Sequence, residues 1–264
     1  MTFTNFDSVN NMSDLLFCVL ILTALTAFAV GGLYATRRLV ARLWGERGAQ
    51  NEIVNAYFGG VGVLYGIALG LIAVGTWEDF SHVDKQVAAE AASIAALWGD
   101  VSALPEPARS TLRTEVKSYV RYAIDSAWPL QRRGVVPLGG MDRVDRMQAM
   151  LGHFAPADQG QTNLQQETLH AFNEVLRAQQ LRLDSVMNGL PAPIWWIVVL
   201  GALLTIAMTW LFVIEPFRAH VVPMVLLAIV IGLLTFLVAA LDNPYRGSIY
   251  VGTEPFELLY ARLR

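Results

Sequence analysis

The stretch YFGGVGVLYGIALGLIAVGT, residues 57–76, contains no Asp, Glu, Lys or Arg. A helix rises 1.5 Å per residue, so about 20 apolar residues cross the ~30 Å hydrocarbon layer of a membrane. Residues 15–35, 192–214 and 221–241 are also uncharged over this length. A soluble core helix rarely stays uncharged on every face for so long. The sequence therefore predicts a polytopic membrane protein built from two helix pairs.

Composition supports this class and excludes others. The chain is 55% hydrophobic and 16% charged, whereas about 25% of residues are charged in an ordinary soluble domain. The net charge of −3 argues against a nucleic-acid partner. Cys18 is the only cysteine, so we expect no intramolecular disulfide and no cysteine-based zinc site. Residues 1–14 lack Lys and Arg, so residues 15–35 are interpreted as a retained helix and not as a secretory signal.

The expected domain organisation has four parts. Residues 1–76 hold the first pair of membrane helices, and residues 191–241 hold the second pair. Residues 77–190 form a helical extramembrane domain inserted between the second and third membrane helices. Residues 242–264 form a tail that docks on this domain. The predicted fold class is all-α, and no segment has the alternating pattern of a strand.

The extramembrane region is expected to be a set of helices. Residues 79–102 are rich in Ala, Gln, Glu and Leu and follow the second span without a helix breaker, which predicts one helix of about 45 residues. Residues 108–127 place apolar side chains on one face of a helix that Trp128-Pro129 should end. Further helices are expected near 142–153 and over 165–187.

Charge near the first span sets the expected orientation. Arg37 and Arg38 end the first helix, and Arg42 and Arg47 lie in the loop that follows. The positive-inside rule places this loop in the cytoplasm. The N-terminus and the extramembrane domain are then expected outside.

Motifs along most of the chain carry a resemblance to a known family. They are Arg37-Arg38, Trp77-Glu78, Glu90-Ala91, Tyr119, Trp128-Pro129, Gly189-Leu190-Pro191, the tail Asp242-Asn243-Pro244-Tyr245-Arg246-Gly247 and Pro255-Phe256. In these motifs the chain resembles the bestrophin-like family of bacterial membrane proteins. The resemblance implies a distant likeness to bestrophins, which are oligomeric ion channels with a pore lined by the second membrane helix. It implies a multi-pass protein of the bacterial inner membrane that binds lipid, conducts inorganic ions and assembles with itself, as a pentamer if bestrophin-like.

The second membrane helix carries the candidate pore. At 100° per residue, one third of its circumference holds Phe58, Tyr65, Leu69, Ile72, Thr76 and Asp79. Apolar rings of Leu69 and Ile72 could gate by dewetting, and a ring of Asp79 would favour cations. Alternatively, the hydroxyls of Tyr65 and Thr76 only bond between helices of one subunit. An adjacent face carries small residues that let another helix approach closely, within or between subunits, namely Gly59, Gly62, Gly66 and Gly70.

Acidic residues follow the second span. In a ring of subunits, Glu78, His82 and Glu90 would contribute to a vestibule that attracts cations. Asp79 and His82 are one helical turn apart and could share a metal ion, but no third ligand stands at a firm spacing, so no metal site is predicted. In the tail, Asp242, Pro244 and Gly247 favour a turn, while Pro255 in the first turn and Phe256 suit a last helix that starts after Thr253.

No catalytic constellation or cofactor motif is present in the sequence. The four histidines, His82, His153, His170 and His220, are scattered, and there is no phosphate-binding loop or nucleophile elbow. We therefore expect no enzyme and no cofactor. The leading interpretation is a homo-oligomeric ion channel or pore. The alternative is a non-conducting membrane protein whose helical domain senses or binds a partner.

Overall fold

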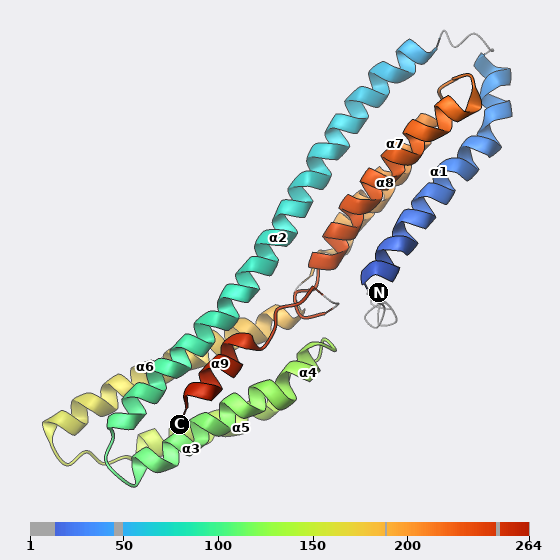
Figure 1. Ribbon diagram of the computed structural model, residues 1–264. Helices are drawn as coiled ribbons and strands as arrows, with labels where there is room; N and C mark the ends of the chain where they lie inside the picture. Colours follow the sequence, from blue (N-terminus) through green and yellow to red (C-terminus); the bar gives the residue numbers. More distant parts are fainter. Residues whose placement is uncertain (1–13, 45–49, 188, 247–248, 264) are drawn as a thin grey trace. The chain divides into compact units, whose positions relative to one another are not determined.

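A computed structural model of the chain describes residues 14–44, 50–187, 189–246 and 249–263. Throughout these ranges every regular element is a helix, so the all-α prediction is confirmed (Figure 1). The chain divides into two compact units. The membrane unit comprises Met1–Glu78 and Gly189–Asp242, and the helical unit comprises Asp79–Asn188 and Asn243–Arg264.

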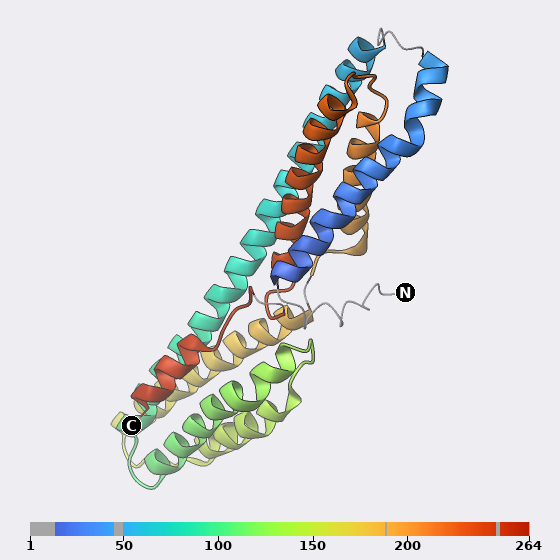
Figure 2. The same cartoon turned by 45° about the vertical axis from the view of Figure 1, so that its right-hand side comes forward.

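The membrane unit contains the four apolar helices. They are α1 (Asp14–Trp44), the first part of α2 (Asn51–Ala103), α7 (Ala192–Thr209) and α8 (Phe217–Leu241), and each is long and apolar enough to cross a membrane. The four lie side by side in both views (Figures 1 and 2). The third span ends at Thr209 and not at residue 214, because the next residues turn and Val213 bonds to the Asn51 side chain at the start of α2.

Close packing inside the membrane unit depends on glycines outside α2. A Cβ on Gly32 would lie 2.0 Å from the Trp210 ring, and the Trp210 indole nitrogen donates to the Ala29 carbonyl over 3.0 Å. A Cβ on Gly201 in α7 would lie 2.3 Å from the Tyr65 ring. These contacts let bulky aromatic rings sit directly on the neighbouring helix backbone.

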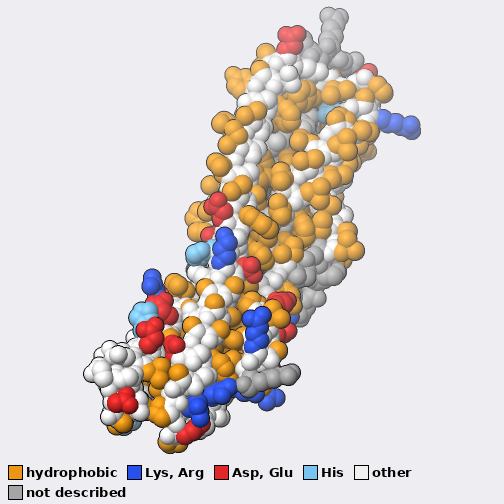
Figure 3. All heavy atoms as spheres, turned by 60° about the vertical axis from the view of Figure 1, so that its left-hand side comes forward, with side chains coloured by type: hydrophobic (Ala, Val, Ile, Leu, Met, Phe, Trp, Pro, Cys, Tyr) orange, Lys and Arg blue, Asp and Glu red, His pale blue; other side chains and the backbone are white. Residues whose placement is uncertain are grey.

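The outer surface of the membrane unit is apolar. Side chains such as Leu64, Leu204 and Leu226 are well exposed. On the face drawn in the space-filling view, hydrophobic side chains predominate over the membrane unit, whereas charged side chains gather over the helical unit (Figure 3). A contiguous apolar surface of this kind suits contact with lipid tails.

The helical unit is a bundle around one apolar core. It holds the rest of α2, α3 (Ala108–Tyr122), α4 (Trp128–Gln131), α5 (Met141–His153), α6 (Gln159–Asp184) and α9 (Glu254–Arg262), with 3₁₀ turns at Leu138–Gly140 and Ser185–Met187. Helix α2 runs for 53 residues, a little longer than predicted. Its buried residues, including Val83, Val87, Ile94 and Leu97, pack against α3, α5 and α6.

A π-helical turn replaces the helix end that was predicted at Trp128-Pro129. The residues Ala123–Ala127 form this turn, and α4 continues helically to Gln131. Pro129 has no N–H and its ring would clash with the carbonyl of Asp125 in a regular α-helix. The wider π turn moves that carbonyl away, so the proline is accommodated inside the helical run.

The tail packs into the core of the helical unit. Tyr245, Phe256 and Leu259 are buried there, and the Val251 N–H donates to the Pro244 carbonyl over 2.8 Å. Helix α9 begins at Glu254, immediately after Thr253 as expected, with Pro255 in its first turn. The Thr253 hydroxyl bonds to the Glu257 carboxylate and makes no bond to the helix backbone. Gly247 lies outside the described residues.

Candidate functional site

The face of α2 that was predicted to line a pore packs inside one chain. Leu69 is 1% exposed and Thr76 is 2% exposed, and both lie against α7 and α8 or the α2 backbone. The Tyr65 hydroxyl donates to the Val198 carbonyl of α7 over 2.8 Å. Ile72 packs against the same cluster. Leu69 and Thr76 are therefore closed off from a pore by packing within the subunit, and the pore-lining prediction is wrong for these two residues. Tyr65 and Ile72 are only partly buried, so their pore-lining role stays a prediction.

The two ends of that face differ from its middle. The Phe58 ring meets Phe212 edge-on, with ring centroids 5.8 Å apart. Asp79, the first residue of the helical unit, is exposed. For Phe58 and Asp79 the pore-lining role stays a prediction.

The glycine stripe of α2 has no partner helix in the part of the chain that the structure describes. A Cβ added to Gly59, Gly62, Gly66 or Gly70 would meet no atom within 4 Å among the described residues. No described residue of the subunit packs on these glycines, since α7 and α8 cover a different face. Packing between subunits stays a prediction.

The predicted vestibule residues separate into two groups. Glu78 and His82 are exposed where α2 leaves its apolar stretch, and the His82 ring bonds to Gln86 over 2.9 Å. Glu90 is fully buried in the helical unit, so its assignment to a vestibule is wrong. Within the described ranges, no cluster of three or more His, Cys, Asp or Glu side chains could hold a metal ion.

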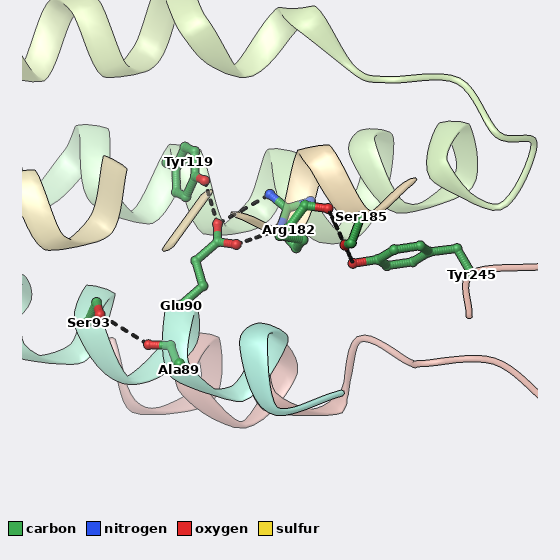
Figure 4. Close-up of polar contacts among 7 residues, drawn as sticks. All are labelled: Ala89, Glu90, Ser93, Tyr119, Arg182, Ser185 and Tyr245. Atoms are coloured by element: carbon green, nitrogen blue, oxygen red, sulfur yellow. Dashed lines mark hydrogen bonds and ion pairs between the residues drawn. The ribbon is translucent and has the colours of Figure 1, made fainter. Parts of the chain in front are cut away.

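Glu90 is instead the centre of a buried polar network (Figure 4). One carboxylate oxygen accepts a bond from the Tyr119 hydroxyl at 2.6 Å and another from Arg182 Nη2 at 3.2 Å. The second oxygen accepts from Arg182 Nε. Ser185 donates to the Arg182 carbonyl over 2.7 Å, and its hydroxyl lies 3.1 Å from that of Tyr245. The network joins α2, α3, α6 and the tail.

Burial sets the protonation states in this network. It raises the pKa of Tyr119 well above the usual range, with a further contribution from the Glu90 charge, so Tyr119 stays a neutral donor. Burial disfavours the charge of Arg182, but the Glu90 carboxylate, together with Tyr119 and Tyr245, more than offsets this and holds the arginine pKa above its usual range. The guanidinium carbon also lies 5.4 Å from the Trp128 ring centroid and 5.7 Å from that of Phe256. The arrangement is a structural clamp with its charges paired.

Sequence reasoning missed Arg182 and Ser185 and misplaced Glu90. A signal was available: Glu90 falls on the same helical face as Val83, Val87 and Ile94. Arg182 likewise follows the stripe of Phe172 and Val175. A charged residue on an apolar stripe indicates a buried partner, because an unpaired buried charge is costly.

The Asp242 side chain links the C-terminal end of α8 to the N-terminal end of α7 by hydrogen bonds. One carboxylate oxygen accepts from the Leu190 N–H, and the other accepts from the Trp195 indole over 3.2 Å. Asp242 follows the last residue of α8, while Leu190 and Trp195 bracket the start of α7. The tail motif therefore begins with a residue that caps the α7 entry.

Known proteins match most of the chain in sequence pattern and in structure. Residues 23–256 match the family model of the Bestrophin-like domain. A crystal structure of a bacterial bestrophin homologue from Klebsiella pneumoniae, carrying a point mutation, aligns with TM-score 0.69 at 10% identity over 93% of this chain and 98% of the other. A second variant of that homologue gives TM-score 0.67 at 12% identity over 93% and 97%. A crystal structure described as a membrane protein gives 0.68 at 12% identity over 93% and 96%. No curated protein sequence matches the chain.

Proposed function

The chain belongs to the Bestrophin-like family, and from this premise we propose that it is a subunit of a homo-oligomeric ion channel in the bacterial inner membrane. The resemblance to bestrophins supports a pentamer that conducts inorganic ions. The proposed activity is conduction, with no enzymatic step. The Arg37 and Arg38 pair after the first span supports a cytoplasmic loop there, with the N-terminus and the helical unit outside.

The observation that carries this proposal is the uncovered face of α2. Val63, Ile67, Leu71 and Val74 recur at helical spacing and are 62%, 57%, 68% and 55% exposed. They point opposite to Leu69 and its neighbours, which occupy the packed face. In a ring of copies with this face towards the axis, the four side chains form successive apolar rings that can gate by dewetting.

The glycines of α2 suit contact between neighbouring copies. Gly59, Gly66 and Gly70 lie on the flank between the packed face and the uncovered face, and they have open space beside them. Small residues at this spacing allow two helices to approach closely. This flank is therefore the proposed contact between adjacent α2 helices of the ring.

Charges at the end of the apolar stretch support cation selectivity. Glu78, Asp79 and His82 are exposed within one and a half turns of α2. Repeated around a ring, the two acids concentrate cations at the mouth of the proposed pore.

The uncovered face of α2 also supports a second candidate function. Between Gly59 and Trp77 the only hydroxyl side chains of α2 are Tyr65 and Thr76, and both are turned into the subunit. The uncovered face is thus purely apolar. That observation favours a non-conducting membrane protein whose helical unit binds a partner.

Single-channel recording on purified, reconstituted protein separates the two functions. Replacing Val63 with Thr adds a hydroxyl at nearly constant volume, which should wet the proposed constriction and increase the open time. Val230→Thr is the matched control, because Val230 lies on α8 and is 53% exposed. Asp79→Asn should move the reversal potential under a salt gradient. Silence from folded oligomers of wild type and Val63→Thr alike would favour the partner-binding function.

A further inference from the structure

One loop of the helical unit combines exposed apolar side chains with exposed arginines. Residues 132–141 read RRGVVPLGGM. Val135 is 49% exposed, Leu138 is 70% exposed and Met141 is 57% exposed, while Arg132 and Arg133 are also exposed. The segment carries no acidic residue, although the whole chain has a net charge of −3. We refer to residues 132–141 as the RR loop.

Contacts within the helical unit tie the RR loop to the tail. The Arg132 guanidinium carbon lies 4.2 Å from the centroid of the Tyr250 ring. Just before the loop, the Trp128 indole donates to the Val251 carbonyl over 3.1 Å.

Arg246 makes a further contact with the loop. Its Nη2 lies only 1.4 Å from where a Cβ on Gly134 would be. Gly134 also has φ +71°, a conformation that favours glycine. The base of the RR loop is therefore held against Arg246, Tyr250 and Val251.

The tail keeps this loop within reach of the membrane surface. Leu241 is the last residue of α8, and Arg246 follows five positions later. An extended residue spans at most about 3.5 Å, so the Arg246 Cα lies within about 18 Å of the end of the span. On the other connection, Met187 is 70% exposed and precedes the first residue of α7, Ala192, by five positions.

We propose that the RR loop docks on the headgroup layer of a bilayer that contains anionic lipid. Arg132 and Arg133 bind lipid phosphates, and Val135, Leu138 and Met141 enter the interfacial layer. Arginine suits this position, because its guanidinium bonds to phosphate oxygens while its stem covers apolar surface. Basic residues beside a membrane helix are attracted by anionic headgroups, and exposed apolar residues beside them add burial in the interface.

Site-directed fluorescence on the reconstituted full chain tests this docking. In a Cys18→Ala background, Leu138→Cys or Met141→Cys carries an environment-sensitive label. Ser110→Cys is the matched control, since Ser110 is exposed on α3 of the same unit. In vesicles of phosphatidylglycerol and phosphatidylethanolamine brominated high on their acyl chains, labels at 138 and 141 should be quenched and the label at 110 should not.

The role of Arg132 and Arg133 in binding anionic lipid is tested in the same vesicles. Arg132→Gln with Arg133→Gln should reduce the preference for phosphatidylglycerol over a zwitterionic lipid by about fivefold per arginine. Labels at 138 and 141 that are as little quenched as the label at 110 would overturn the proposal. Quenching that instead falls when labelled subunits are diluted with unlabelled ones would also overturn it, because that result assigns the RR loop to a contact between copies.

Discussion

Glu90 and Arg182 form a buried ion pair that spans 92 residues of sequence and joins α2 to α6. The Glu90 side chain is 0% exposed and that of Arg182 is 2% exposed. Both carboxylate oxygens accept bonds from the guanidinium, and Tyr119 provides a third donor. Charges this deeply buried are tolerated only when they are paired and hydrogen bonded.

Removing one partner of this pair should be strongly destabilising. Glu90→Gln leaves the Arg182 charge buried without its counter-ion, and we expect a loss of about 3–5 kcal/mol in the free energy of unfolding. The measurement is chemical unfolding of the purified protein in detergent, followed by circular dichroism. Asp125→Asn is the control, because Asp125 pairs with Arg121 on the surface and its loss should change stability by less than about 0.5 kcal/mol. Equal effects of the two substitutions would contradict a buried clamp.

Stability should fall at alkaline pH through Tyr245. Burial raises the pKa of Tyr245 to about 12, although the Ser185 hydrogen bond and the Arg182 charge both act to lower it. The unfolded tyrosine ionises near pH 10, so the stabilisation is complete below pH 10 and is lost as the pH rises towards about 12. The loss should approach roughly 3 kcal/mol. Tyr245→Phe should show a shallower decline in unfolding free energy between pH 9 and about 12, and an unchanged slope would refute the assignment.

Any side chain at Gly134 should be destabilising, chiefly because of the positive φ there. Gly134→Ala places a side chain at positive φ and obliges the flexible end of Arg246 to move, and we expect a loss of about 1–2 kcal/mol, mostly from the backbone. Adding Arg246→Ala removes this contact but not the backbone strain, so it should restore only part of the stability. The test is a double-mutant cycle of thermal unfolding. Strictly additive effects would mean that the two residues do not interact.

Two glycines of the membrane helices should respond differently to alanine. Gly201→Ala places a Cβ 2.3 Å from the Tyr65 ring and should lower the stability of the subunit by about 1–3 kcal/mol. Gly66→Ala meets no described atom within 4 Å and should leave subunit stability unchanged. If the α2 flank is a contact between copies, Gly66→Ala should weaken assembly, as measured by light scattering and cross-linking in detergent. An unaltered oligomer would exclude Gly66 from that contact.

The sequence predicted those features that depend on local composition. Each apolar run over 15–35, 57–76, 192–214 and 221–241 lies within or mostly within a helix of the membrane unit. The start of α9 was also anticipated, since proline acts on the backbone where it stands.

Errors in the candidate site share one cause. Helical spacing showed correctly that Tyr65, Leu69, Ile72 and Thr76 share a face of α2, but not what that face meets. The same limit applied to Glu90, whose partner is distant in the chain. Spacing along one helix contains no information about which other helix covers it.

By itself, the sequence determined that this chain is an all-helical membrane protein with four apolar helices, because the free energy of moving a helix from water into lipid is a sum over its own residues. Only the tertiary structure decided which face of α2 is packed and which is left uncovered. It also decided that Glu90 is clamped by Arg182 and that the RR loop carries its apolar side chains on the surface. These features depend on pairing between residues far apart in sequence, which packing selects and local composition does not encode.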